Sequence, residues 1–167
     1  MTRASGIQKE LKQNRPFVGK SQEAAVALLR TADLIRRHVS SVVEASDLTI
    51  QQYNVLRILR GAGEKGLPTL EIAERMIEQT PGITRLVDRL EAKKLVTRER
   101  CETDRRQVFC RIDAAGLELL AALDDPLREA EEEALSTLGK RELVQLLGLL
   151  ERARDGIRTS LESRQPR

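Results

Sequence analysis

The chain has 167 residues, enough for one domain with a substantial core or for two small interlocked domains. Aromatic residues make up only 2% of it, which argues against a large aromatic-lined ligand pocket built by this subunit alone. Two cysteines are too few for a disulfide scaffold, and no apolar run approaches the roughly 20 residues that span a bilayer.

The net charge of +3 is small but unevenly distributed. Residues 1–20 and residues 75–111 each carry a net charge of +4, whereas residues 113–135 carry −7. This asymmetry predicts a polyanionic partner that meets one face of the protein. The first residues lack the apolar stretch of a signal peptide, so we expect a cytoplasmic protein, not bound to a membrane, whose cysteines stay reduced.

The N-terminal third is predicted to contain an arm and two helices. Residues 1–20 are polar, basic and interrupted by proline and glycine, and we expect a poorly ordered arm. From Ser21 to about Ala45, apolar residues recur at helical spacing. Thr49 can cap the helix that follows, and glycines between residues 61 and 66 predict a loop after it.

Two shorter helices and a hairpin are expected next. Thr69 should cap the first helix, and Thr80 followed by Pro81 should open the second, which runs to Lys93. Two segments with period-two alternation then predict a β-hairpin, at residues 95–101 and 107–112. The hairpin residues expected to face the core are Val96, Val108, Cys110 and Ile112.

Two long helices complete the chain. Asp113 should cap one that runs to about Ser136, with Pro126 producing a kink or a break, and the last begins at Lys140. Together with the helix over residues 21–45, they carry more apolar surface than one small domain could cover. We therefore expect these helices to form a homodimer, and a self-contained helical bundle is the alternative.

The predicted fold is mainly α with a small β-hairpin wing (α+β), because helix, turn, helix and basic hairpin are the plan of a winged helix-turn-helix. The expected organisation is a basic arm at 1–20, a winged helix-turn-helix domain at 48–112, and terminal dimerisation helices at 21–47 and 113–163. A winged helix lays its second helix into the major groove of DNA, which makes double-stranded DNA the expected partner.

The apolar stripe of the helix over residues 81–93 fixes which side chains point outward. Arg85 can offer a bidentate fork to guanine, Gln79 can pair with adenine, and threonines can contact phosphate or a thymine methyl. The adjoining basic hairpin favours DNA contact over an ordinary solvated helix face. The predicted major-groove residues are Gln79, Thr80, Gly82, Thr84, Arg85 and Arg89.

The hairpin tip carries Asp104, Arg105 and Arg106. Arginines at the end of a two-stranded ribbon suit a narrow minor groove, where the negative potential is enhanced. Asp104 can orient Arg106 across the turn, and a merely solubilising turn is the alternative reading. Further cations lie on the predicted strands, at Arg98, Arg100 and Arg111.

Several stretches resemble the MarR family of winged-helix regulators, in the family's order. They are Leu48–Leu56, Ile83–Glu91, Leu95–Arg98 and Asp104–Arg106. The resemblance covers roughly residues 21–160 and implies a dimeric transcription regulator, commonly a repressor, that binds a pseudo-palindromic operator. It also implies that the terminal helices form the dimer, and that a small, often aromatic effector binds between them and the DNA-binding domain.

The chain departs from the family pattern at two positions. Lys94 stands where the family usually has glycine, and if that position is left-handed, lysine costs about 1 kcal/mol. Asp113 replaces the usual threonine cap, which is an equally good choice.

Other chemistry finds little support. Cys101 and Cys110 are expected opposite each other on the hairpin, where oxidant sensing is conceivable but small reduced core residues are the better interpretation. His38 is the single histidine, so we expect no metal site, no cofactor and no catalytic residues, and hence no enzyme. The main rival to DNA binding is a winged helix that binds protein.

Overall fold

The computed structural model describes residues 6–79, 81–100 and 108–164. The chain falls into two compact units, Met1–Glu131 and Glu132–Arg167. The first unit contains α1 (Gly6–Glu10), α2 (Lys20–Glu44), α3 (Ile50–Ala62), a 3₁₀ turn (Gly63–Lys65), β1 (Leu67–Pro68), α4 (Thr69–Arg75), α5 (Ile83–Ala92), β2 (Val96–Arg100) and β3 (Val108–Ile112). Helix α6 (Ala114–Ala134) runs across the division, and α7 (Lys140–Glu162) belongs to the second unit.

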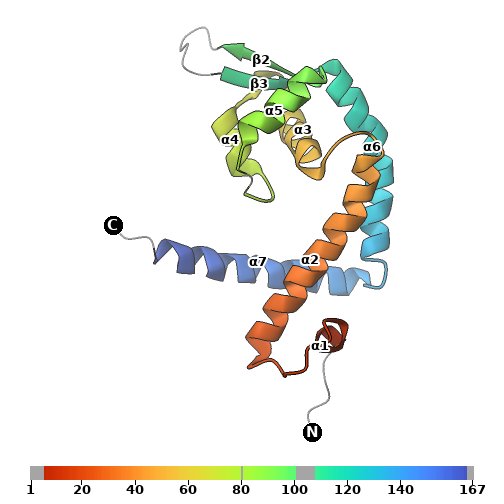
Figure 1. Ribbon diagram of the computed structural model, residues 1–167, viewed down its shortest axis with the longest axis vertical. Helices are drawn as coiled ribbons and strands as arrows, with labels where there is room; N and C mark the ends of the chain where they lie inside the picture. Colours follow the sequence, from red (N-terminus) through yellow and green to blue (C-terminus); the bar gives the residue numbers. More distant parts are fainter. Residues whose placement is uncertain (1–5, 80, 101–107, 165–167) are drawn as a thin grey trace. The chain divides into compact units, whose positions relative to one another are not determined.

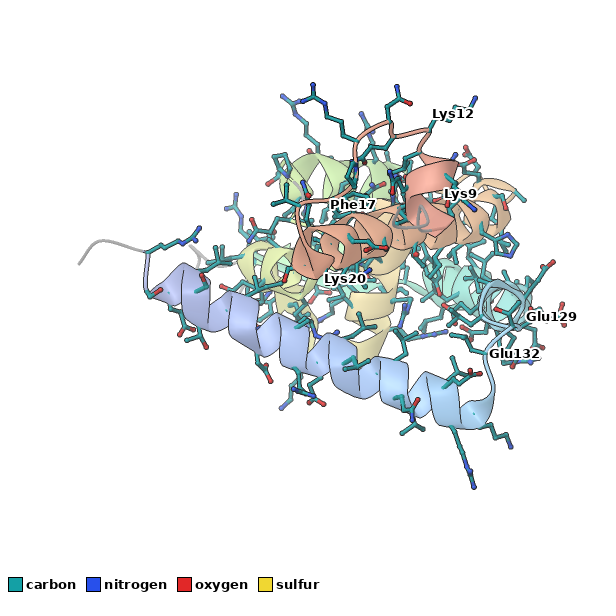
Figure 2. The ribbon with its side chains drawn as sticks, turned by 90° about the horizontal axis from the view of Figure 1, so that it is seen from below. Lys9, Lys12, Phe17, Lys20, Glu129 and Glu132 are labelled. Atoms are coloured by element: carbon teal, nitrogen blue, oxygen red, sulfur yellow. The ribbon has the colours of Figure 1, made fainter. Side chains whose placement is uncertain are left out.

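The arm before α2 is not wholly irregular. Residues 6–10 form α1, and the Glu10 carboxylate accepts a hydrogen bond from Nε of Arg30 on α2 at 2.7 Å. Part of the segment that was expected to be a poorly ordered arm therefore forms a short helix, which has an ion-pair partner on α2. Lys9, Lys12 and Lys20 lie along the arm and the start of α2, whereas Glu129 lies on α6 (Figure 2).

The predicted helix over residues 21–45 is confirmed as α2, and the predicted cap of α3 is confirmed as well. The Thr49 side chain accepts a hydrogen bond from the backbone N–H of Gln52 at 3.2 Å, and the Gln52 side chain accepts one from Thr49 N–H at 2.9 Å. This reciprocal pair satisfies two donors that the first helical turn leaves open. Helix α3 extends through Gly61, which had been assigned to the loop.

The starts of α4 and α5 differ from the prediction. Thr69 is the first residue of α4 rather than its cap, and its Oγ1 lies 3.7 Å from Sγ of Cys110. Helix α5 begins at Ile83, because Gly82 at φ 88° adopts a left-handed conformation that interrupts the helix. Pro81 therefore precedes α5 instead of opening it, and Thr80 lies outside the described residues.

The sheet has three antiparallel strands in the order β1–β3–β2, beside α3, α4 and α5 (Figure 1). The sequence predicted the β2–β3 hairpin but not β1, whose Leu67 pairs with Cys110. Cys110 lies opposite Arg98, so the expectation that the two cysteines face each other is wrong. The strand register differs from the one expected, and Cys101 lies outside the described residues.

One hydrophobic core joins the end of α2, the winged-helix domain and α6. Val96 and Cys110 are fully packed into it as predicted, whereas Val108 and Ile112 are half-buried. Helix α6 continues through Pro126 without a break and contributes its own buried residues, Leu120, Leu123 and Leu127.

Helix α7 carries many large apolar side chains that the chain itself does not bury. None of its residues, all of which the structure describes, is buried within the chain. Five of its large apolar side chains are 58–69% exposed, at Val144, Leu147, Leu149, Ile157 and Leu161, whereas Leu143, Leu146 and Leu150 are half-buried. In the described part of the chain, no helix is both long and apolar enough to cross a membrane.

Candidate nucleic-acid interface

Helix α5 has one buried and one exposed face. Ile83, Val87 and Leu90 pack inward, at 0–7% exposure, and their spacing turns the intervening polar residues outward. This division agrees with the sequence analysis. Five of the six residues predicted for the major groove are exposed: Gln79, Gly82, Thr84, Arg85 and Arg89.

The N-terminal end of α5 is open and carries a partial positive charge. Gly82 O accepts the N–H of Arg85 at 2.9 Å, while the first N–H groups of a helix have no partner within it. A Cβ on Gly82 would meet no atom within 4 Å, so this end of the helix is accessible. Because Gly82 has no side chain, an anion can approach the backbone closely at this end of the helix.

Arg98 of β2 points to α5 and is held there. Its Nη2 lies 2.6 Å from Oδ1 of Asp88 and donates to the carbonyl oxygen of Thr84 at 3.2 Å, and its Nη1 lies 3.4 Å from Oε2 of Glu91. Burial disfavours the charge of Arg98, but the hydrogen bond to Asp88 and the two carboxylates outweigh it and raise the pKa of Arg98. Arg98 therefore fastens the wing to α5 and is not a free cation for DNA.

The remaining charged residues predicted for the wing fall into three groups. Arg111 is paired with Glu99 on the adjacent strand, whereas Arg100 is exposed. The tip residues Asp104, Arg105 and Arg106 lie outside the described residues.

The C-terminal end of α5 closes in a way that explains the departure at Lys94. Lys94 has φ 58°, its N–H donates to Glu91 O at 2.8 Å, and Leu95 N–H donates to Leu90 O at 3.0 Å. These two bonds form a Schellman motif, which favours glycine at the left-handed position. Leu95 is buried, so the turn leads directly into β2.

A second feature of the first unit is a cavity of about 370 Å³ between α2, α3 and the segment after α4. Nε of Arg36 lies 3.8 Å from Oε1 of Glu78 at its edge, and the Arg57 guanidinium carbon lies 5.8 Å from the centre of the Tyr53 ring. Burial raises the pKa of Tyr53 above its ordinary 10.0, against the charge of Arg57, so the phenol stays a neutral donor at neutral pH. The lining residues are Ala32, Ile35, Arg36, Val39, Ile50, Gln51, Tyr53, Asn54, Arg57, Met76, Ile77, Glu78 and Glu131.

The individual cavity residues were not predicted. Aliphatic side chains form most of the walls, and Tyr53 is the one aromatic residue among them, so low aromatic content did not prevent a cavity. The lining comes from segments far apart in sequence, and no local pattern marks them as neighbours.

Metal and thiol chemistry find no site in the described ranges. There, histidine, cysteine, aspartate and glutamate do not gather in threes as a metal ion would require. Cys110 is fully buried, as expected for a small core residue.

Comparison with known proteins agrees with this geometry. The MarR family model matches residues 48–108. A solved MarR transcription factor from Planctomyces limnophilus is 40% identical, with a TM-score of 0.63, over 81% of this chain and 98% of that one. The HTH-type transcriptional regulator MhqR of Bacillus subtilis (strain 168) is 28% identical over 133 residues, covering 80% of this chain and 90% of the regulator.

A third likeness is one of fold alone. Sco3205, a MarR family transcriptional regulator of Streptomyces coelicolor solved in complex with DNA, has a TM-score of 0.74 at 20% identity, over 86% of this chain and 92% of that one. The family match over the winged-helix domain and the 40% identity across nearly all of a solved relative agree with the observed helix-turn-helix and wing. This chain therefore belongs to the MarR family of winged-helix transcriptional regulators.

Proposed function

We propose that the protein is a homodimeric repressor that binds a pseudo-palindromic operator and releases it in response to a small molecule. The observation that carries the DNA contact is the exposed polar face of α5, which is open at its positive N-terminal end. Membership of a family of transcriptional regulators makes catalysis the weaker interpretation. A regulator of this bacterial type acts on DNA, so we assign the protein to the cytoplasm.

The major-groove contacts are assigned by chemistry and exposure. Arg85 supplies a bidentate fork for guanine, and Gln79 supplies an amide for adenine. Gly82 permits close approach of the backbone to the duplex. The remaining contacts, to phosphate or to a thymine methyl, are assigned to Thr80, Thr84 and Arg89.

The minor-groove contact is assigned to the wing. Strand β2 ends at Arg100 and strand β3 begins at Val108, and the three tip residues predicted from the sequence lie between them in the chain. We assign Arg105 and Arg106 to the narrow minor groove and Asp104 to the orientation of Arg106.

The dimer is assigned to α2, α6 and α7. Helix α7 has no buried residue, although five of its large apolar side chains need a partner surface. On α2, Leu29 is 72% exposed as well. A second copy of the chain would cover these faces and present two α5 helices to successive turns of one face of the duplex.

The effector is assigned to the cavity that Tyr53 lines. Aliphatic walls favour a small, largely apolar molecule, and the Tyr53 hydroxyl with Arg36 and Arg57 can bind a phenol or carboxylate on it. Because the cavity joins α2 to the winged-helix domain, an occupant can favour one arrangement of the two over another.

The DNA assignment is tested by binding titrations on a duplex selected from a random library. Arg106→Ala should lower affinity for all duplexes alike, whereas Arg85→Ala should relax specificity at one position per half-site. Arg141→Ala, which removes an exposed cation of α7, is the matched control and should change neither. Full affinity in both test variants would contradict the assignment.

Salt dependence separates DNA binding from the rival role in protein binding. Counterion release makes the affinity for a duplex fall steeply as salt rises, and each phosphate contact adds about one to the slope. An affinity for duplex DNA that is absent even at low salt would favour a protein partner.

The effector assignment is tested by thermal unfolding in the presence of substituted phenols and benzoates. A ligand of the cavity should raise the melting temperature of wild type and weaken operator binding. Ala32→Trp places a ring at the exposed edge of the cavity and should abolish both effects while leaving operator binding intact. Equal responses in the two proteins would move the effector site elsewhere.

A further inference from the structure

The connection between α2 and α3 is a tight turn with a fixed bend. Helix α2 ends at Glu44 and α3 begins at Ile50. The N–H of Ser46 donates to Val43 O and the N–H of Asp47 donates to Glu44 O, both at 3.0 Å. Asp47 has φ 55°, a left-handed conformation that aspartate tolerates better than most residues. The direction in which α3 leaves α2 is therefore set at Asp47.

Lys93, at the C-terminal end of α5, reaches this turn. Its ammonium group donates to the main-chain carbonyl of Asp47 and lies 2.7 Å from the carboxylate oxygen Oδ2. The Lys93 side chain is 34% exposed, whereas the Asp47 side chain is 97% exposed. One side chain thus links the end of α5 to the turn that follows α2.

Other polar contacts also join the winged-helix domain to the terminal helices. Nε of Arg36 on α2 lies 3.8 Å from Oε1 of Glu78, which precedes α5. Arg60 of α3 donates from both terminal nitrogens to the Asp124 carboxylate of α6, at 2.8 and 3.0 Å. This bidentate pair holds α3, and it does not touch α5. In the part of the chain that the structure describes, Lys93 makes the polar contact that joins α5 itself to the turn after α2.

We infer that Lys93 is a positioning residue that sets the angle between α5 and α2, and thereby the operator half-site spacing that the dimer accepts. The inference rests on the proposed function, because α2 belongs to the proposed dimer surface and α5 to the proposed DNA contact. In a dimer, a change of angle at each joint moves the two α5 helices relative to each other. The charge of Lys93 is engaged by the turn rather than offered to phosphate.

Lys94 provides a matched control. It carries the same charge at the next position, is exposed, and contributes its backbone to the turn that ends α5. Substituting methionine for either lysine removes one positive charge from the same end of α5. Only the substitution at Lys93 removes the contact with Asp47.

The experiment measures spacing preference. The probes are the tightest-binding duplex selected by wild type from a random library, two versions with the half-sites one base pair closer or farther apart, and a single half-site. Lys93→Met should lower the preference for the selected spacing by about threefold and leave single half-site affinity unchanged. Lys93→Arg should retain the preference. Lys94→Met should weaken binding to all four probes by one common factor.

The outcomes separate the inference from the function on which it rests. If Lys93→Met weakens all four probes equally, Lys93 contacts phosphate and the inference is overturned. The same holds if the melting temperature falls while the preference is unchanged, because Lys93 then only stabilises the fold. If Lys93→Met does not fold, the second variant is Asp47→Gly, because glycine suits the left-handed turn and lacks the carboxylate. This variant should lower the preference for the selected spacing by a smaller factor, and an unchanged preference overturns the inference. If wild type binds none of the duplexes, the proposed function itself fails.

Discussion

Replacing Arg98 by methionine should separate the wing from α5 while keeping a side chain of similar length. Arg98 makes two ion pairs, with Asp88 and Glu91, and one hydrogen bond to Thr84 O. Ion pairs near the surface contribute about 0.2–1 kcal/mol each, and a hydrogen bond from a charged donor contributes somewhat more. The side chain is only 23% exposed, which places these pairs toward the upper end.

The expected loss is about 2 kcal/mol in the free energy of unfolding, which corresponds to roughly 4–8 °C in melting temperature for a chain of this size. The measurement is urea unfolding followed by circular dichroism at neutral pH and moderate salt. A double-mutant cycle with Asp88→Asn should return a coupling of about 1 kcal/mol for the Arg98–Asp88 pair. Arg100→Met, which removes an exposed cation two residues along the same strand, should change stability by less than about 0.5 kcal/mol.

Two results would refute this reasoning. One is a loss in Arg98→Met no larger than in Arg100→Met, which would mean that the three contacts contribute nothing net. The other is additivity of the Arg98 and Asp88 substitutions, which would mean that the side chains act independently despite lying 2.6 Å apart.

Three further predictions concern the turn that ends α5 and two contacts of α6. Lys94→Gly should stabilise the protein by about 1 kcal/mol in the same assay, because glycine relieves the left-handed strain at φ 58°; no gain would remove the strain argument. Gly116→Ala should destabilise it by roughly 1–3 kcal/mol, since the added Cβ would lie 2.5 Å from the backbone oxygen of Leu95; a neutral effect would show that α6 can shift. The hydrogen bond from Arg60 lowers the pKa of Asp124 below its ordinary 3.8, so the pair stabilises the fold fully above that value and loses its contribution as pH falls through the lower folded value. Unfolding of wild type and Asp124→Asn should differ by less than about 1 kcal/mol at neutral pH and converge in acid; a pH-independent difference would exclude the ion pair as its source.

Local patterns predicted most elements and several of their ends. The spacing of apolar residues predicted α2 and α7, and period-two alternation predicted β2 and β3. Thr49, a polar residue just before α3, was predicted as its cap. The same apolar stripe divided α5 correctly into buried and exposed faces, which is why the exposure of Thr84 and Arg85 could be predicted. Each of these features depends on residues within one or two turns of the chain.

Several of the errors lie where a partner is distant in sequence. Strand β1 has two residues and exists only through its pairing with β3. Thr69 was predicted as a cap from its local sequence, whereas its side chain contacts Cys110, which is 41 positions away. The strand register, which places Cys110 opposite Arg98, depends on the length of the segment between the strands and not on alternation within them.

The sequence by itself determined the order of the elements, the exposed face of α5 and the apolar surplus of the terminal helices, because side-chain periodicity is a property of a single helix or strand. Tertiary structure decided what the charged residues do. The sequence predicted Arg98 as one more cation of a basic wing, but the approach of β2 to α5 places it in an ion pair within the fold. Likewise Lys93 contacts a turn 46 positions earlier, and the cavity beside Tyr53 arises where four separate segments meet. Whether a charged side chain contacts DNA, another part of the fold or solvent depends on the groups that lie within a few ångströms of it. The distances to those groups are set only when the chain folds.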